Sequence, residues 1–140
     1  MVCLQSGRPD TRSAKPLSGV DVVVVDDEQA IRDLFSDVLQ IAGARVRVAS
    51  TARDALGLIE AEMPHVVVSD VMMPNEDGYW LIAAIRGMGP RRPRTLAITG
   101  DAEQHSRDAM LRAGYDAHLT KPIGVDTLVT VVGRLAGRAQ

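Results

Sequence analysis

The sequence predicts an α/β protein built on a doubly wound parallel sheet of five strands, in the order 2-1-3-4-5, with five helices. Three short aliphatic runs, Val22–Val25, Val66–Val68 and Leu96–Ile98, have the composition of strands that are buried on both faces. Strand and helix patterns alternate five times, which favours right-handed crossovers between parallel strands. The chain of 140 residues is long enough for one domain with a sizeable core, and no internal repeat is visible.

The first half of the chain has the pattern of two strands and two helices. A strand at about 20–25 is followed by a helical apolar face and by Gly43, a candidate C-cap. The segment Arg45–Val48 alternates in polarity and is expected to be a short edge strand. Thr51 is a suitable N-cap for the next helix, which ends before Pro64. The residues that form an apolar face are Ile31, Leu34, Phe35, Val38 and Leu39 in the first helix, and the apolar positions of the second are Ala52, Ala55, Leu56 and Ile59.

The second half continues the alternation with three strands, at about 65–69, 95–99 and 116–120. Asp77 is expected to cap the helix after the first of them, and Asp101 with Gln104 resembles a capping box that opens the next helix. Gly114 is expected to end that helix. The inward positions are Leu81, Ile82 and Ile85, and near the C-terminus Val125, Leu128, Val129, Val132 and Leu135. The predicted strand order is that of flavodoxin-like sheets.

Residues 1–19 are rich in Ser, Arg, Pro and Gly without periodicity, so they are expected to form a disordered N-terminal tail. The predicted domain spans residues 20–137, and residues 138–140 form a C-terminal tail. Cys3 is the only cysteine, which excludes an intrachain disulfide. Because the sequence also lacks a signal peptide and an apolar stretch of membrane length, we expect a cytoplasmic protein without membrane insertion.

Charge separates this tail from the domain. Three basic residues and one acid give residues 1–19 a net charge of +2, so the −2 of the whole chain leaves −4 on residues 20–140. Affinity for nucleic-acid backbones comes mainly from Lys and Arg, so we expect no direct binding of nucleic acid. The one basic cluster, residues 90–94, lacks interleaved aromatic residues and is interpreted as a solvated loop.

Three acidic side chains follow strands that are neighbours in the predicted sheet. Asp26 and Asp27 end the first strand, and Asp70 ends the third. Functional groups collect at the carboxyl ends of parallel strands. Crowded carboxylates repel one another unless a cation neutralises them, and such oxygen ligands suit Mg²⁺. One of the adjacent pair could instead cap the following helix, but capping does not account for all three acids.

Lys121 follows the last strand and is the only lysine among the thirteen basic residues of 20–140. Its ammonium could reach a carboxylate or phosphate as a point charge. Chance in an arginine-biased composition could explain a lone lysine, but its place at a strand end favours a function. Pro122 follows it, and an X-Pro bond in a tight turn can be cis. Thr99 ends the fourth strand with a hydroxyl that could donate to a phosphoryl oxygen, and Gly100 beside it leaves space for one.

Together these residues resemble the receiver domain of two-component response regulators. The residues that carry the resemblance are Asp26-Asp27-Glu28, Asp70 with Met73-Pro74 and Asp77-Gly78, Thr99-Gly100, and Lys121-Pro122. It covers about residues 20–137, and the combination is specific although each piece alone is weak. The resemblance implies a conformational switch that accepts a phosphoryl group from a histidine kinase or a histidine phosphotransfer protein. It implies no enzyme beyond catalysis of its own phosphorylation and dephosphorylation.

By the same resemblance, Asp70 is the phosphoacceptor, Lys121 pairs with the phosphoryl group, and Thr99 moves in to bond it. The implied Mg²⁺ ligands are Asp26 or Asp27, Asp70 and the backbone carbonyl of Met72. Physical chemistry agrees with this assignment, because phosphoryl transfer mainly needs in-line positioning and neutralisation of oxygen charge. A carboxylate nucleophile that forms an aspartyl phosphate is known covalent chemistry.

Two positions depart from the usual pattern of the family or bear on the lifetime of the phosphoryl group. Three residues before Lys121, the family's usual Tyr or Phe is His118 here, so the usual coupling to Thr99 need not transfer unchanged. A tolerated variant on the last strand is the simpler interpretation of His118. Met72 places an apolar side chain near the phosphoryl site, and our hypothesis is that it slows hydrolysis by excluding water. Simple packing is the alternative for Met72.

Several arrangements and two other classes stay open. A stand-alone regulator and the C-terminal receiver of a hybrid kinase both fit, whereas a DNA-binding regulator is disfavoured because no basic helix follows residue 137. A Mg²⁺-dependent aspartate-nucleophile phosphatase would need D-x-D after its first strand, which Asp26-Asp27-Glu28 lacks. A non-phosphorylated interaction module would not need Asp70 and Lys121. The sequence identifies neither the cognate kinase nor the downstream effector.

Overall fold

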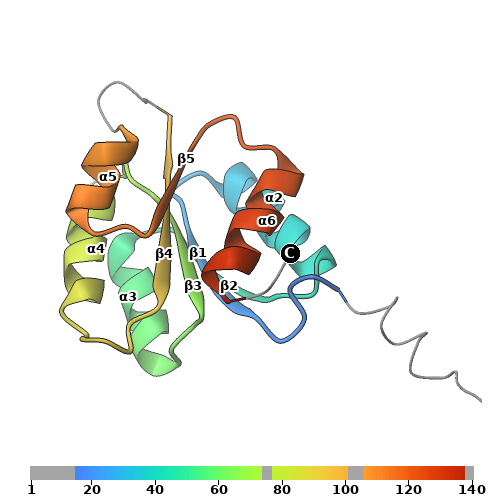
Figure 1. The fold of residues 1–140 in the computed structure, drawn as a ribbon, viewed down its shortest axis with the longest axis horizontal. Coiled ribbons are helices and arrows are strands. Elements are labelled where there is room, and N and C mark those ends of the chain that lie inside the picture. Colours follow the sequence, from blue (N-terminus) through green and yellow to red (C-terminus); the bar gives the residue numbers. More distant parts are fainter. Residues whose placement is uncertain (1–14, 74–76, 101–105, 138–140) are drawn as a thin grey trace, which may run out of the picture.

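The computed structural model describes residues 15–73, 77–100 and 106–137. They form a parallel five-stranded sheet in the order β2-β1-β3-β4-β5, with helices on both faces (Figure 1). The strands are β1 (Asp21–Val25), β2 (Arg45–Ala49), β3 (Val66–Asp70), β4 (Arg94–Thr99) and β5 (Ala117–Thr120). The helices are α2 (Gln29–Ile41), α3 (Ala52–Ala61), α4 (Gly78–Arg86), α5 (Arg107–Ala113) and α6 (Val125–Leu135). The predicted fold class and strand order are confirmed.

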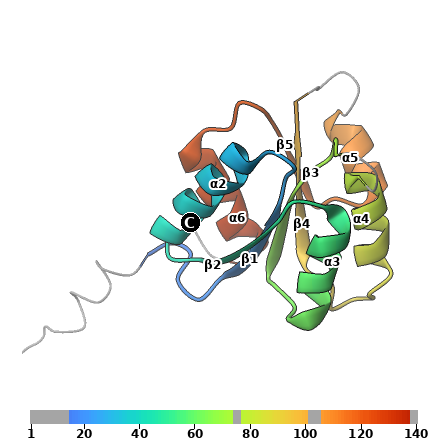
Figure 2. The same cartoon turned by 180° about the vertical axis from the view of Figure 1, so that it is seen from behind.

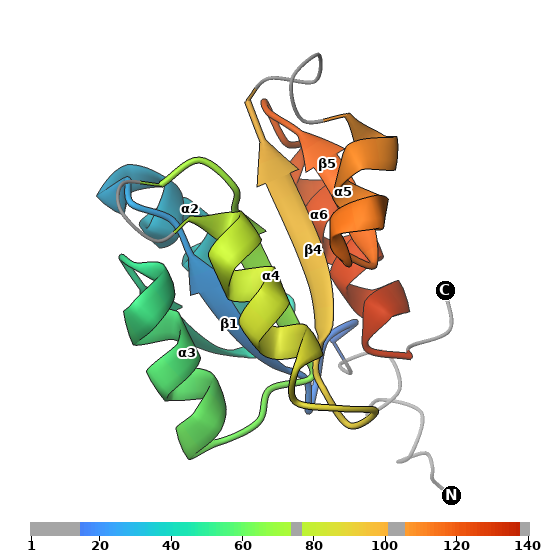
Figure 3. The ribbon, with the colours of Figure 1, turned by 90° about the vertical axis from the view of Figure 1, so that its left-hand side faces the viewer.

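Different helices cover the two faces of the sheet. Figures 1 and 2 show α2 and α6 on one face and α3, α4 and α5 on the other, and Figure 3 looks onto the second group. Along β1, Val22 and Val24 pack with α2 and α6, whereas Val23 and Val25 pack with α3 and α4. A strand buried on both faces must be apolar at every position, which is why the aliphatic runs are unbroken.

The edge strand and the predicted helix starts at Thr51 and Asp77 are confirmed. β2 lies at the edge of the sheet, and its Val48 is 44% exposed. Thr51 Oγ1 accepts a hydrogen bond from the backbone N–H of Asp54 at 3.1 Å, and the Asp77 carboxylate caps the first turn of α4. Among the described residues, no helix is both long enough and apolar enough to cross a membrane.

The start of α5 differs from the sequence expectation. Asp101 and Gln104, the proposed capping box, lie outside the described residues, and the described helix begins at Arg107. Its N-cap is Ser106, whose Oγ accepts a hydrogen bond from the backbone N–H of Ala109 at 3.2 Å. A serine at this place has the same capping chemistry as the proposed aspartate, so composition alone did not separate the two. The C-terminal end is as predicted, because Gly114 has a left-handed φ of 118°.

Residues 15–19, which the composition assigns to the tail, are part of the folded unit. Leu17 is completely buried, and its backbone N–H donates to the carbonyl of Ala42 at 2.8 Å. Gly43, with a φ of +107°, makes room for this segment, since a Cβ there would lie 2.9 Å from the backbone nitrogen of Ser18. A single leucine in a polar stretch has no periodicity, so the sequence could not show this contact. Residues 1–14 and 138–140 lie outside the described ranges.

Candidate functional site

The carboxyl ends of β1 and β3 bring three carboxylates together. Asp26 and Asp27 follow β1, and Asp70 ends β3, its parallel neighbour in the sheet. One oxygen from each of the three residues lies within 4.8 Å of the others. Asp26 and Asp70 are only 1% and 6% exposed, whereas Asp27 is exposed. The sequence placed these acids at neighbouring strand ends, and the structure brings all three into one cluster.

The two oxygens of Asp26 have different surroundings. Oδ1 accepts a hydrogen bond from the backbone N–H of Glu28 at 2.9 Å. This bond does not cap α2 in the way that the sequence left open, because the N-cap is Glu28 and no side chain makes the capping hydrogen bond. Oδ2 is buried and makes no hydrogen bond within the described part of the chain. The Nζ of Lys121 lies 3.5 Å from it, longer than a good hydrogen bond. A buried carboxylate oxygen of this kind favours a nearby cation.

Burial and mutual repulsion disfavour the charged forms of these acids. Burial, with the neighbouring charge of Asp26, raises the pKa of Asp70 to about 6, although Lys121 and the backbone N–H of Met72 oppose the shift. Burial likewise raises the pKa of Asp26. A divalent cation would restore the charged forms. The cluster offers only carboxylate oxygens, a donor set that fits Mg²⁺ better than Zn²⁺.

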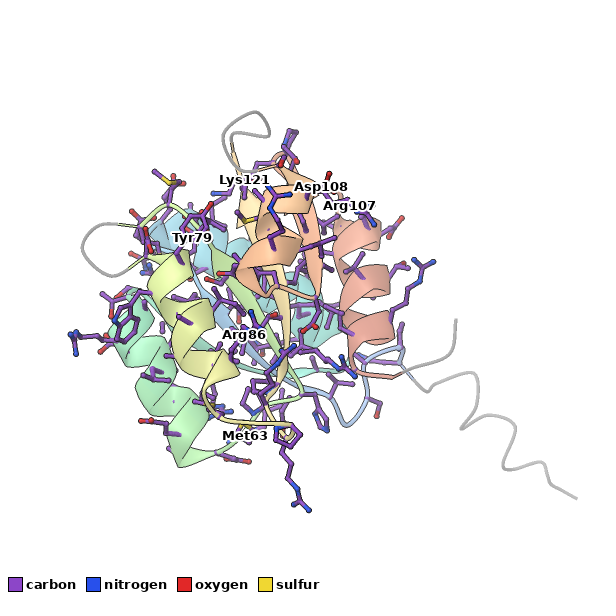
Figure 4. All side chains as sticks on the ribbon, turned by 60° about the vertical axis from the view of Figure 1, so that its left-hand side comes forward. Met63, Tyr79, Arg86, Arg107, Asp108 and Lys121 are labelled. Carbon is purple, nitrogen blue, oxygen red and sulfur yellow. The ribbon has the colours of Figure 1, made fainter. Side chains whose placement is uncertain are left out.

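Lys121 reaches the acid cluster from the opposite side of β3. Its Nζ lies 3.9 Å from Oδ1 of Asp70 and 3.9 Å from Oε1 of Glu28, in addition to the contact with Asp26. Its backbone N–H donates to the carbonyl of Thr99 at 2.7 Å, and the bond to Pro122 is cis. Figure 4 shows Lys121 at one end of the molecule and Met63 at the other. The lysine singled out by the sequence therefore lies in the site.

Thr99 is completely buried, and its hydroxyl contacts His118. The Oγ1 of Thr99 lies 2.8 Å from Nε2 of the imidazole. Ala97 pairs with His118 across β4 and β5, and Thr99 lies two residues beyond Ala97, so both side chains lie on the same face of the sheet. The family resemblance pairs these two positions in the switch and leaves open whether His118 supports the usual coupling, and the structure shows the two side chains in direct contact.

The two methionines after Asp70 have different environments. Met73 is 8% exposed and packs in the core beside α3 and α4, as expected for a packing residue. Met72 is 55% exposed, and its backbone N–H donates to the Asp70 carboxylate. The backbone of Met72 therefore lies next to the acid cluster. Pro74 falls outside the described residues.

Two contacts of the site were missed by sequence reasoning. Arg32 donates from Nη1 to the backbone carbonyl of Asp26 at 2.8 Å. The hydroxyl of Tyr115 donates to the carbonyl of Gly78 at 2.8 Å, at the start of α4. Arg32 lies on a helix where periodicity marks only polar and apolar positions, so no sequence signal points to its partner. Tyr115 lay close to the family's switch position, but its direction was not predictable.

Comparison with known proteins agrees with this geometry. A family model described as the response regulator receiver domain matches residues 22–133, which include Asp26, Asp70, Thr99 and Lys121. The chain belongs to this family. The receiver is 42% identical over 118 residues to an uncharacterized 14.6 kDa protein of Leptolyngbya boryana, covering 83% of this chain and 89% of that protein.

Longer proteins also contain a segment similar to this receiver. It is 36% identical over 119 residues to the response regulator MprA of Mycolicibacterium vanbaalenii, covering 85% of this chain and 51% of MprA. It is 33% identical over 138 residues to the sensor histidine kinase RcsC of Salmonella typhimurium, covering 98% of this chain and 14% of RcsC. Among solved structures, a Francisella response regulator receiver domain superposes with a TM-score of 0.79 at 28% identity, covering 87% of this chain and all of that one.

Proposed function

We propose that this receiver accepts a phosphoryl group on Asp70 from a histidine kinase or a histidine phosphotransfer protein, and that the modification drives a conformational switch. The observation that carries the proposal is the grouping of three carboxylates around one lysine at the carboxyl edge of the sheet. Asp70 is the member of that group that contacts both Lys121, at 3.9 Å, and the backbone N–H of Met72. Its family membership supports the same role.

In the proposed reaction, a carboxylate oxygen of Asp70 bonds to phosphorus while the bond from phosphorus to the donor's imidazole nitrogen breaks. The electron pair of the broken bond stays with the imidazole. With a pKa of about 6, Asp70 is mostly ionised at pH 7 to 8 and available as the nucleophile. Lys121 would meet the oxygens of the transferred group as a point charge.

Asp26, Asp27, Asp70 and the backbone carbonyl of Met72 are the proposed ligands of Mg²⁺. When bound, Mg²⁺ would neutralise part of the charge on the transferred phosphoryl oxygens. The support is the set of oxygen donors within 4.8 Å and the buried Oδ2 of Asp26, which makes no hydrogen bond in the described structure. Lys121 would add a second positive charge near the phosphoryl group on Asp70.

The switch that we propose is an exchange of partners by Thr99. Its hydroxyl contacts His118 at 2.8 Å and would bond an oxygen of the phosphoryl group on Asp70 instead. That exchange moves a buried side chain at the end of β4 and alters its contact with β5, so a local charge change reaches a second strand. His118 thus occupies the sequence position where the family usually has Tyr or Phe, but it makes a polar contact with Thr99.

An apolar hollow beside Lys121 supports docking of the phosphodonor next to the acceptor. It has a volume of about 390 Å³ and is lined by Ile31, Leu34 and Phe35 of α2 and by Lys121, Pro122 and Ile123. Leu34, expected on the apolar face of its helix, is nevertheless 47% exposed there. An amphipathic helix that carries the phosphohistidine could cover these apolar side chains and place its imidazole over Asp70.

The remaining parts of the proposal concern the whole protein. We propose a cytoplasmic receiver that works through protein partners rather than by direct binding of nucleic acid, and that turns over no other substrate. The net charge of −4 on residues 20–140 and the presence of a single cysteine, Cys3, support this assignment. The partially exposed Met72 is proposed to slow hydrolysis of the aspartyl phosphate, and an unchanged dephosphorylation rate in Met72→Asn would refute that role.

The decisive experiment treats the protein with acetyl phosphate and Mg²⁺, and separately with beryllofluoride and Mg²⁺. Intact-protein mass spectrometry should show one phosphoryl group on Asp70, and Asp70→Asn should abolish it. Loss of labelling on addition of a chelator would support the metal requirement. Steady turnover of a small phosphoester would instead indicate an aspartate-nucleophile phosphatase, and labelling that survives Asp70→Asn would refute the proposed acceptor.

A further inference from the structure

A tyrosine outside the acid cluster contacts the segment that leaves Asp70. Tyr115 is 3% exposed and packs among Val71 of that segment, Ile82 of α4 and Met110 of α5. Its hydroxyl donates to the carbonyl of Gly78, 37 residues away in the chain. Burial raises the pKa of Tyr115, so the hydroxyl keeps its proton and acts as a donor at every physiological pH.

The two described ends of the connection between β3 and α4 meet at this tyrosine. The backbone N–H of Gly78 donates to the carbonyl of Val71 at 2.9 Å, which joins the first residue after β3 to the first residue of α4. A Cβ at Gly78 would lie 2.7 Å from the Cα of Val71, 2.8 Å from the Tyr115 hydroxyl and 3.0 Å from the carbonyl oxygen of Asp70. Only glycine allows so close an approach at position 78. The Tyr115 hydroxyl therefore lies at a tight contact between the start of α4 and the backbone of Asp70 and Val71.

The contact between Val71 and Gly78 helps to fix the backbone next to the acids. Val71 donates its N–H to the carbonyl of Ile98 at 3.1 Å and is completely buried, so it is anchored on β4 as well. Met72 follows Val71 directly, and its N–H donates to the Asp70 carboxylate. Met72 therefore directly follows a residue that is held twice, because Val71 donates to Ile98 and accepts from Gly78, the residue whose carbonyl accepts from Tyr115.

We infer that Tyr115 is a positioning residue: its hydrogen bond to Gly78 holds the contact between Gly78 and Val71, and thereby the Met72 backbone beside the carboxylates that are proposed to bind Mg²⁺. This inference rests on the proposed function, because it assigns a cause to the placement of one proposed Mg²⁺ ligand. Groups that orient metal ligands without touching the metal typically change metal affinity 10- to 100-fold when they are removed. Tyr115 acts on only one backbone ligand, so we expect a change in Mg²⁺ affinity at the lower end of this range, about 10-fold.

Tyr115→Phe tests the inference, because it keeps the buried ring and removes only the hydroxyl, which donates to Gly78 and is also hydrogen-bonded with the side chain of Ser69. We expect Mg²⁺ to bind about 10-fold more weakly by isothermal titration calorimetry, and the Met72 amide resonance to shift even before Mg²⁺ is added. The matched control is Tyr79→Phe, because Tyr79 lies in the first turn of α4 and is 37% exposed. This variant should bind Mg²⁺ like wild type. Amide hydrogen exchange at Gly78 should be faster in Tyr115→Phe only.

The outcomes separate this inference from the proposed function. If wild type binds Mg²⁺ and Tyr115→Phe binds it equally tightly, even with a lower melting temperature, the tyrosine has only a packing role and the inference is wrong. If wild type binds no Mg²⁺, the proposed metal site fails and the inference fails with it. Gly78→Ala, which pushes the same contact apart, should weaken Mg²⁺ binding at least as much, and normal binding in that variant would also overturn the inference.

Discussion

The hydroxyl of Thr99 lies 2.8 Å from Nε2 of His118, so the buried threonine is held by a ring on the neighbouring strand. Replacement of His118 by Phe keeps a flat ring but removes the nitrogen. Thr99 then loses a partner worth about 1 kcal/mol, and urea unfolding should show a loss of that size. Because the lost bond is absent from the proposed phosphorylated state, beryllofluoride should bind about 5-fold more tightly.

A double-mutant cycle checks whether the two side chains act together. Thr99→Val removes the hydroxyl and keeps the branched shape, so His118→Phe should have a much smaller effect on unfolding in that background. Simple addition of the two single effects would contradict a direct interaction between the threonine and the histidine.

The raised pKa of Asp70 predicts how stability depends on pH without Mg²⁺. Because the folded value is about 6 and the unfolded value 3.8, the folded state binds more protons between these values. The contribution of the Asp70 carboxyl group to folding stability is therefore highest below about pH 4. It decreases as the pH rises from there through about 6, and it no longer changes at higher pH. At pH 7.5, Asp70→Asn should raise the free energy of unfolding by about 1–3 kcal/mol.

Asp37→Asn, an exposed change on α2, serves as the control for that experiment. It should leave both the stability and its pH profile close to wild type. Saturating Mg²⁺ should reduce the gain seen in Asp70→Asn, since a cation removes the reason for the raised pKa. A destabilised Asp70→Asn in chelator would show that the cluster is not strained by its own charge.

Lys121 should have opposite effects on Mg²⁺ and on phosphorylation. Its Nζ lies 3.5 Å from Asp26 and 3.9 Å from Asp70, so it competes with any other cation for the same carboxylates. Lys121→Met should therefore tighten Mg²⁺ binding several-fold, while the rate of labelling by acetyl phosphate falls at least about 100-fold. Calorimetry and mass spectrometry measure the two effects, and weaker Mg²⁺ binding in Lys121→Met would contradict this account of the site.

At the opposite end of the sheet, the Asp116 carboxylate is held by several donors. Arg92 donates two hydrogen bonds to it, at 3.0 and 3.1 Å, and the backbone N–H of Thr95 donates a third at 2.8 Å. Burial opposes ionisation, but these donors outweigh it and lower the pKa of Asp116. Asp116→Asn should lower the free energy of unfolding by about 2 kcal/mol at pH 7.

This loss should itself depend on pH. A lowered pKa means that the carboxylate stabilises the fold above pH 3.8, and that this stabilisation disappears as pH falls through the folded value. Urea unfolding at pH 7 and pH 3 should show the difference. Glu62→Gln is the control: Arg45 and Glu62 form an exposed pair at 2.6 Å, which should contribute little. Equal losses in the two variants would contradict the importance of burial.

Leu17 predicts where the stable domain begins. Its side chain is completely buried, so Leu17→Ala should cost about 2–4 kcal/mol of unfolding free energy. Ile41→Ala, on α2 and 72% exposed at this residue, should change stability much less. Chemical unfolding of a chain that begins at Val20 should show a loss like that of Leu17→Ala. Full stability in that shortened chain would restore the boundary drawn from composition.

The fold was predictable because strands that are buried on both faces of a sheet consist of uninterrupted apolar residues, a pattern that is visible in the sequence. Val22–Val25 and Val66–Val68 are apolar throughout since helices cover each face of a parallel sheet, and the acids that stop these runs had to emerge at one edge. The position of Lys121 after the last strand followed from the same order. The helix N-caps Thr51 and Asp77 were predictable from the sequence because each bonds only to backbone N–H groups two or three residues further along the chain.

The directions of individual side chains, and the partners that they contact, follow from packing in three dimensions. Periodicity assigns a residue to a face, but it carries no information about which oxygen of Asp26 turns to the helix and which stays beside Lys121. The contact of Tyr115 with Gly78 and that of Thr99 with His118 join segments distant in the chain, and each depends on how helices and strands pack. Local sequence patterns were therefore enough to predict the sheet and the set of chemical groups at its edge. Packing determined which of those groups are in contact, because contact distances depend on the arrangement of whole elements rather than on local patterns.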